Sequence, residues 1–253
     1  MNRVFDVSMF HWEFDLLELR MRELWDVVDN FVITESLYDH RGKPRELLLE
    51  KNLDRFDWAK EKMIINVSDA PDVANDSWDY ERHHRRESIR AVDQLNPEDS
   101  DLFLVSDMDE IFRASTVKEI TGEDGIYTMH MPMYYFYFNL FVHDWYQPTA
   151  ISYKYINDLD RIRDCGGYVL RNAGWHFSYL GSEEDILHKL KTFAHDEYDT
   201  PEFTNMDNIK RALEKREDLF GRDDGVVFRA RDIDESWPQY FKDNIEKYER
   251  FII

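Results

Sequence analysis

The chain alternates between short apolar runs, which are typical of buried strands, and longer stretches with apolar residues at helical spacing. The predicted helices of the first half cover residues 13–25 and 79–94. The predicted strands cover residues 4–10, 27–36, 62–67 and 101–107. Because strands that alternate with helices favour a mostly parallel sheet, we expect an α/β fold with a mostly parallel central sheet flanked by helices.

The second half is richer in strand-like and aromatic segments. Residues 125–141 form a long strand-like run that is broken near Pro132, and Thr116 with Glu119 forms a capping-box pair for a helix ending near residue 121. Further strands are predicted over residues 149–156 and 168–180, and further helices over 183–195, capped by Ser182, and 206–217. No repeat and no Gly/Ser linker interrupts this pattern, so we expect one domain over residues 1–253.

Composition narrows the classes of function. The chain has 53 acidic and 32 basic residues and a net charge of −21, and such a surface disfavours nucleic-acid binding because it repels phosphate backbones. The lone cysteine, Cys165, excludes an internal disulfide, and its neighbours indicate a turn. No segment has the about 18 consecutive apolar residues that span a bilayer, and the start does not resemble a signal peptide. We therefore expect a soluble protein of the cytoplasm.

The most informative segment is residues 102–112, LFLVSDMDEIF, in which an apolar strand runs into a group of acids. Side chains two apart in an extended segment point the same way, so Asp107 and Asp109 are predicted to share a side while Met108 faces away. Mg²⁺ or Mn²⁺ would remove the repulsion between two such carboxylates. Ligands of open α/β sheets also bind beyond the carboxyl ends of strands. The segment is therefore either a metal site or a solvated turn with helix-capping acids.

Two chemistries use a metal in this position. In sugar transfer from a nucleotide donor, the metal stabilises the diphosphate as it leaves. In haloacid-dehalogenase-like phosphatases, which DMDEI also resembles, an Asp attacks the phosphoryl group. Those phosphatases carry the motif on their first strand, whereas about a hundred residues precede it here, so position favours the transferase. A carbohydrate-binding protein without catalysis is the third interpretation.

Blocks across nearly the whole chain resemble glycosyltransferase family 17, the group of the N-acetylglucosaminyltransferase that adds bisecting GlcNAc to N-glycans. The blocks are FDVSMFHWEFDLLELRMRELWDVVDNFVITES, HRGKPRELLLEKN, ERHHRRESI, LVSDMDEI, YYFYFNL, AGWHFSYLG, ILHKLKTFAH and WPQYFKDNIEKYERFII. SDMDEI together with GWHFSYLG is the most specific combination. The animal enzymes have a membrane anchor and a stem, and we expect neither in this protein.

The resemblance implies a GT-A-type fold, a UDP-sugar donor that is expected to be UDP-GlcNAc, a carbohydrate acceptor, Mn²⁺ (or Mg²⁺), and inversion at the anomeric carbon. Residues 1–112 would bind the nucleotide sugar, and residues 113–253 would bind the acceptor. Asp107 and Asp109 are expected to hold the metal. His176 is expected as a further ligand, because GT-A enzymes often use a late histidine, and a packed core histidine is the alternative.

Four residues are predicted to bind the donor, and Asp107 is one of them. Arg85 lies where the family has a Gln-Arg pair and would reach the uracil, ribose or diphosphate, unless it belongs to a solvated helix face. Lys43 follows a glycine and would meet a phosphate or belong to a plain turn. Glu35 ends the second predicted strand and would accept hydrogen bonds from the nucleoside.

The aromatic segments supply the predicted acceptor site. Tyr135 and Tyr137, and Trp175 in GWHFSYLG, combine flat apolar rings with a polar tip, so they would stack on a sugar or belong to the core. His83 and His84 are adjacent, so they diverge on a helix and are predicted to lie on the surface.

Inversion needs a base that takes the proton of the acceptor hydroxyl from across the sugar, so neither Asp107 nor Asp109 can serve. Glu110 adjoins the metal pair and is expected to point toward the acceptor, which makes it the first candidate. Asp158 after SYKYI is the second candidate and Asp144 the third. The alternative for each is a surface acid.

Overall fold

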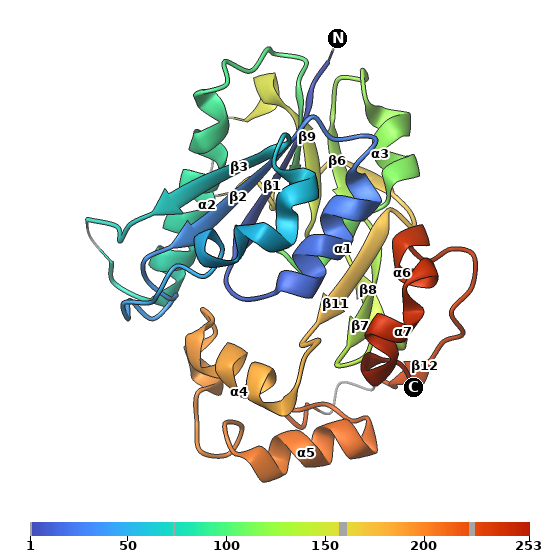
Figure 1. Cartoon of the computed structure of the whole chain (residues 1–253). Coiled ribbons are helices and arrows are strands. Elements are labelled where there is room, and N and C mark those ends of the chain that lie inside the picture. The colour runs from blue at the N-terminus through green and yellow to red at the C-terminus, as the bar shows by residue number, and fades with distance from the viewer. Residues whose placement is uncertain (1, 73, 157–160, 223–225) are drawn as a thin grey trace.

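The computed structural model describes residues 2–72, 74–156, 161–222 and 226–253, which form two sheets with helices around them (Figure 1). The larger sheet has the strand order β10-β6-β9-β4-β1-β2-β3. Its strands are β1 (Val4–Phe10), β2 (Asn30–Ser36), β3 (Met63–Ser68), β4 (Leu102–Val105), β6 (Ile126–Met129), β9 (Thr149–Ser152) and β10 (Tyr168–Leu170). The predicted parallel arrangement holds for β1 to β4, but β9 is antiparallel to both β4 and β6, so the sheet as a whole is mixed.

Helices connect the parallel strands, because parallel neighbours need a crossover. Helix α1 (Phe14–Leu24) links β1 to β2, and α2 (Ser77–Asp93) lies between β3 and β4. Val4 of β1 packs in one core cluster with Leu17 of α1, whereas Phe5 packs in another cluster with Ile89 of α2. Both faces of the sheet are therefore covered, and all of β1 is buried.

The smaller sheet brings the second half of the chain to Asp107, Asp109 and Glu110, which we call the acid motif. It has the order β12-β8-β7-β11-β5 and consists of β5 (Glu110–Phe112), β7 (Met131–Tyr135), β8 (Leu140–Trp145), β11 (Gly174–Ser178) and β12 (Arg229–Ala230). β11 is antiparallel to β5 and places His176 opposite Glu110. The backbone N–H of Phe177 donates to the carbonyl oxygen of Asp109 (2.8 Å). This pairing fixes His176 beside the acid motif.

The predicted strands of the second half are shorter in the structure. The run 125–141 is divided among β6, β7 and β8, and Phe136 follows β7 with a φ of 64°. The run 168–180 is divided between β10 and β11, which belong to different sheets. Asn172, with a φ of 55°, lies between them, and Asn is among the residues that tolerate this conformation. Strand β4 ends at Val105, before the acids.

Of the two predicted helix N-terminal caps, one is found in the structure and the other is not. Helix α3 (Ala114–Ile120) follows Arg113 and has no side-chain cap, so Thr116 lies inside the helix and the predicted capping box is wrong. Helix α4 (Glu183–Thr192) begins after Ser182, whose hydroxyl and backbone form a capping box with Asp185, so that prediction is confirmed.

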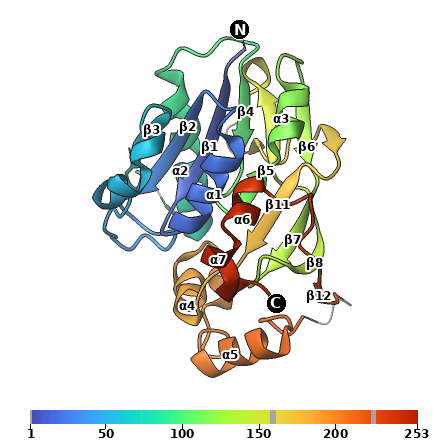
Figure 2. The same ribbon diagram turned by 45° about the vertical axis from the view of Figure 1, so that its right-hand side comes forward.

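The other helices of the described residues are α5 (Met206–Lys215), α6 (Gln239–Asp243), α7 (Ile245–Tyr248) and the 3₁₀ segments η1 (Glu50–Ala59), η2 (Tyr153–Tyr155), η4 (Asp196–Tyr198) and η5 (Glu249–Phe251). Helices α4 and α5 lie at the end of the molecule opposite the N-terminus, beyond the carboxyl end of β1 (Figure 2). Arg41 holds the end of α4 by donating to the carbonyl oxygens of Leu190 (3.2 Å) and Phe193 (2.9 Å).

Within the described ranges, every helix is too short or too polar to cross a bilayer.

Candidate active site

A cavity of about 640 Å³ opens beyond the carboxyl ends of β1 and β4. The chain passes from β1 to β2 and β3 on one side of β1 and then returns to β4 on the other side, so the strand order reverses between β1 and β4. Open α/β sheets bind ligands at this kind of position. Trp12 after β1 and Asp107 and Asp109 after β4 line the cavity, and Lys189 of α4 faces them. The volume falls in the range of small-molecule sites.

Asp107 is held by two arginines from different parts of the chain. Its Oδ1 accepts from Arg85 of α2 (2.8 Å), and its Oδ2 accepts from Arg163 (2.6 Å). Burial alone would raise the pKa of Asp107, but Arg163 and Arg85 outweigh burial and hold the pKa well below its usual range. The carboxylate is therefore charged, although its side chain is still 40% exposed to the cavity.

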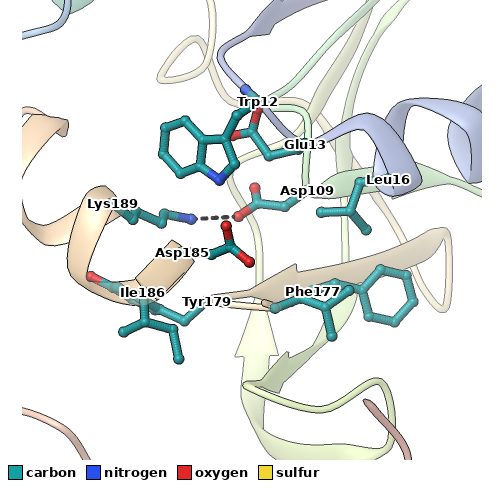
Figure 3. Close-up of a pocket in the computed structure, with 10 residues that line it drawn as sticks. Trp12, Glu13, Leu16, Asp109, Phe177, Tyr179, Asp185, Ile186 and Lys189 are labelled. Atoms are coloured by element: carbon teal, nitrogen blue, oxygen red, sulfur yellow. Dashed lines mark hydrogen bonds and ion pairs between the residues drawn. The ribbon is translucent and has the colours of Figure 1, made fainter. Parts of the chain in front are cut away.

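Asp109 has a different pair of partners. Its Oδ2 accepts from Lys189 (2.8 Å; Figure 3), and its Oδ1 lies 3.6 Å from Nε2 of His176. Burial would raise the pKa of Asp109, but the ammonium group of Lys189 is the main opposing influence and the pKa is lowered. Burial lowers the pKa of His176, so its imidazole is neutral near pH 7. Nδ1 of His176 is buried and has no hydrogen-bond partner in the described part of the chain.

A buried ion pair fixes the backbone of the acid motif. Arg20 of α1 donates to both carboxylate oxygens of Asp6 on β1 (2.6 and 2.7 Å), and the two side chains are almost completely buried. The same guanidinium donates to the carbonyl oxygens of Asp107 (2.8 Å) and Glu110 (3.0 Å). The sequence signal for this pair is a charged residue inside each of two apolar patterns, and the sequence predictions above do not include it.

The first candidate for the base, Glu110, does not reach the cavity. Its side chain is fully buried, because β5 begins at this residue and turns it toward the interior. Oε2 accepts from the backbone N–H of Asp107 (2.7 Å), and Oε1 accepts from Trp145 Nε1 (2.6 Å) and from Arg163. Glu110 therefore positions the acid motif and Arg163, and the expectation that it points toward the acceptor is wrong.

The predicted set of three metal ligands is not assembled. Within the described residues, no group of three or more His, Cys, Asp or Glu side chains is arranged to hold a metal ion. Both oxygens of Asp107 are paired with arginines. Asp109 and His176 do lie side by side, and their oxygen and nitrogen are ligand types that Mn²⁺ accepts. A pair of this kind fits a cation whose other ligands are water and substrate phosphate.

Two predicted donor residues lie away from the cavity. Glu35 is buried, and its carboxylate accepts from Arg45 (2.9 Å) and from the backbone N–H groups of Leu48 (2.6 Å) and Leu49 (2.9 Å). It therefore fixes the chain after β2 and is not available to a nucleoside. Lys43 is exposed in a turn and does not line the cavity, which agrees with the alternative of a plain turn.

Of the three aromatic residues predicted to bind the acceptor, one lines the cavity and two do not. Tyr135 lines the cavity. Tyr137 packs against a core cluster, and Trp175 is buried with the guanidinium of Arg113 over its ring (4.2 Å), so neither lines the cavity. Trp145 and Tyr179 line the cavity, although the sequence did not single them out.

The remaining sequence predictions have mixed outcomes. His84 is 1% exposed and its Nε2 lies 2.7 Å from the hydroxyl of Ser36, so the prediction that it lies on the surface is wrong. Asp144 is half exposed and paired with His130 (3.2 Å), and it does not line the cavity. Asp158 lies outside the described residues.

Asp107 and Asp109 both line the cavity, but the backbone that carries them differs from the predicted one. They follow the end of β4 and belong to a turn, not to an extended segment. Met108 between them is buried in the main core cluster. Arg163 and Lys189, which pair with the two aspartates, are 56 and 80 residues further along the chain, and no local pattern marks either of them.

The comparisons with known proteins define the class. The chain belongs to glycosyltransferase family 17, whose family model matches residues 1–223, and the resemblance seen in the sequence is confirmed.

Its curated relatives include the β-1,4-mannosyl-glycoprotein 4-β-N-acetylglucosaminyltransferases of Homo sapiens (28% identical) and Mus musculus (27% identical). Each match extends over 236 residues and covers 75% of this chain, but only 43% of the human and 42% of the mouse protein. The chain therefore spans less than half the length of these relatives. Among solved structures, it is similar to the inositol-1-phosphate CTP transferase from T. maritima, with a TM-score of 0.40, 13% identity, and coverage of 83% of this chain and 96% of that one.

Proposed function

We propose that this protein transfers N-acetylglucosamine from a UDP-sugar to a glycan acceptor, with inversion at the anomeric carbon, on a GT-A-type fold. Membership of family 17 and the activity named for the human relative support the sugar and the acceptor class. The observation that carries the proposal is the cavity beyond β1 and β4, where Asp107, Asp109 and His176 lie beside basic side chains.

The charges in the cavity support an anionic donor. The whole chain has 32 basic and 53 acidic residues, whereas the cavity lining is more balanced, with five basic side chains, among them Arg85, Arg163 and Lys189, beside six carboxylates. Guanidinium and ammonium groups are the usual partners of phosphate oxygens, and they stabilise the charge that develops on a leaving diphosphate. Trp12 and Trp78 line the same cavity and offer aromatic faces to a nucleobase.

Asp109 and His176 would hold the divalent cation, Mn²⁺ or Mg²⁺. When bound, this cation supplies positive charge that stabilises the diphosphate as it leaves. Asp107 is not in this pair, since Arg85 and Arg163 occupy its oxygens. Its role in the proposal is to orient these two guanidinium groups toward the donor.

The acceptor would bind against the aromatic wall of the cavity. Tyr135, Tyr179, Phe220 and Phe228 all line it, and flat rings of this kind stack on sugars. The base that takes the acceptor proton must lie across the sugar from the diphosphate. With Glu110 buried, Asp158 is the candidate that we retain.

The phosphatase is the weaker interpretation. A nucleophilic aspartate needs a carboxylate oxygen that can approach phosphorus, but Arg85 and Arg163 engage both oxygens of Asp107. The motif also follows the fourth strand of the chain, not the first.

The test is to incubate the protein with UDP-GlcNAc, UDP-glucose or UDP-galactose in the presence of Mn²⁺ or Mg²⁺ and to measure UDP release. We expect slow hydrolysis that is fastest with UDP-GlcNAc. Asp109→Asn should lower the rate by about 100-fold or more, because it weakens charge stabilisation of the leaving group, while the circular dichroism spectrum stays unchanged. Phosphate release from simple esters without UDP release would support the phosphatase, and UDP-sugar binding without turnover would support a binding protein.

A further inference from the structure

Arg163 links the two acids of the site that lie at different depths. Its Nη1 donates to Oδ2 of Asp107 (2.6 Å), whose side chain is 40% exposed, and its Nη2 donates to Oε1 of Glu110, which is fully buried. The Arg163 side chain itself is 13% exposed and lines the cavity. One side of the guanidinium is therefore anchored in the interior, and the other side lies at the cavity wall.

The buried partner of Arg163, Glu110, is held in place by other groups, and its cavity-side partner, Asp107, also pairs with Arg85. Glu110 is fixed by Trp145 and by the backbone N–H of Asp107. Asp107 has a second cation, Arg85, so it stays paired if Arg163 turns to another anion. Nε of Arg163 is buried and has no hydrogen-bond partner within the described residues. A guanidinium has five N–H donors in a planar fork that matches phosphate oxygens, so this residue has donor capacity to spare.

Arg85 is less suited to this task. Arg85 pairs with Asp107 and also with Glu81, which lies four residues earlier on the same helix. Two carboxylates therefore hold its guanidinium. Lys189 is a single ammonium group, and Asp109 engages it. Among these three, Arg163 alone has one carboxylate partner that is fully buried, Glu110, and another at the cavity wall, Asp107.

We propose that Arg163 binds the diphosphate of the nucleotide donor, with Glu110 as its fixed anchor and Asp107 as the counter-ion that it leaves when the donor enters. This inference rests on the proposed function, since it assigns a residue to the donor that the function requires. In the absence of donor, Asp107 satisfies the cavity-side N–H of Arg163. In its presence, a phosphate oxygen takes this N–H, and Arg85 keeps Asp107 paired.

The test compares the affinities of UDP and uridine for the full chain, by calorimetry and ligand-observed NMR, with and without Mn²⁺. Arg163→Gln should weaken UDP binding at least about tenfold, since charge-assisted hydrogen bonds are the strong ones, and should leave uridine binding unchanged. Arg163→Lys keeps the charge but loses the fork, so its UDP affinity should be intermediate. Arg161→Gln is the matched control, because Arg161 is exposed in the same segment and does not line the cavity.

The outcomes separate the inference from the proposed function. If wild-type protein binds no UDP, the proposed function fails. If the wild-type protein binds UDP and the affinity of Arg163→Gln for UDP is within twofold of it, the assignment of Arg163 is wrong. The assignment is also wrong if Arg163→Gln weakens the binding of uridine as much as the binding of UDP. If Arg163→Gln does not fold because Glu110 has lost its cation, Arg163→Lys is compared with the wild-type protein. An affinity for UDP within twofold of wild type then shows that the assignment is wrong.

Discussion

Replacing Arg20 by Met should strongly destabilise the fold. Arg20 and Asp6 are 0% and 1% exposed, and the pair is bidentate, with distances of 2.6 and 2.7 Å. The substitution leaves the carboxylate of Asp6 buried without its cation, and removing one partner of a buried ion pair costs about 3–5 kcal/mol. Domains are stable by only about 5–15 kcal/mol, so the loss is a large fraction of the total. Urea denaturation followed by tryptophan fluorescence measures it.

A double variant separates the contribution to stability from the contribution to the site. Replacing both partners, Asp6→Leu with Arg20→Met, leaves no unpaired charge, and apolar replacement of a buried pair is often neutral or stabilising. Most of the lost free energy of unfolding should therefore return. The carbonyl oxygens of Asp107 and Glu110 still lack the guanidinium that fixes them, so UDP binding should stay weaker than in the wild-type protein.

Two results would refute this reasoning. One is a loss of less than about 1 kcal/mol in the Arg20→Met variant, the range expected for an exposed pair. The other is a double variant that regains both stability and UDP affinity, which would mean that Arg20 does not hold the acid motif in its binding geometry.

Three further predictions follow from other contacts. Burial lowers the pKa of His84 to about 2, below the about 6.5 of an unfolded chain, so its stabilising contribution is complete above pH 6.5 and falls by up to about 1.4 kcal/mol per pH unit below it. His84→Gln should therefore flatten the dependence of urea midpoints on pH between 6.5 and 4, and an unchanged slope would contradict this. Glu110→Gln should weaken UDP binding several-fold without moving the pH–rate profile of transfer, because Glu110 anchors Arg163 and takes no proton; a shifted profile would restore it as the base. Gly174→Ala should destabilise the fold by more than about 2 kcal/mol, since its Cβ would clash with the carbonyl oxygen of Ile111, and a thermal midpoint equal to wild type would refute the clash.

The local elements of the first half are predictable because each depends on a short pattern. The apolar runs of β1 and β2 and the helical spacing of α1 predict those elements. Ser182 likewise predicts the start of α4, and the structure places it in a capping box with Asp185. Such signals succeed because burial of one strand or one helix face is decided by neighbours close in the sequence.

The second half is harder to predict, because its strand boundaries depend on segments that are far apart in the sequence. The run 168–180 is continuous in its apolar character, yet its two ends pair with strands of different sheets, and Asn172 provides the bend. Strand partners are chosen by the packing of the whole sheet, and a local pattern cannot distinguish one long strand from two short ones.

The sequence by itself determined where the acids of the site lie, because Asp107 and Asp109 follow a buried strand and such strands end at the ligand-binding edge of a sheet. Only the tertiary structure decided what these acids contact. The pairing of β5 with β11 brings His176 beside Asp109, and the packing of α4 brings Lys189 to it from 80 residues away. Tertiary structure also turned Glu110 inward against Arg163, because contacts between distant segments are set by the shape of the assembled core, which no short stretch of sequence contains.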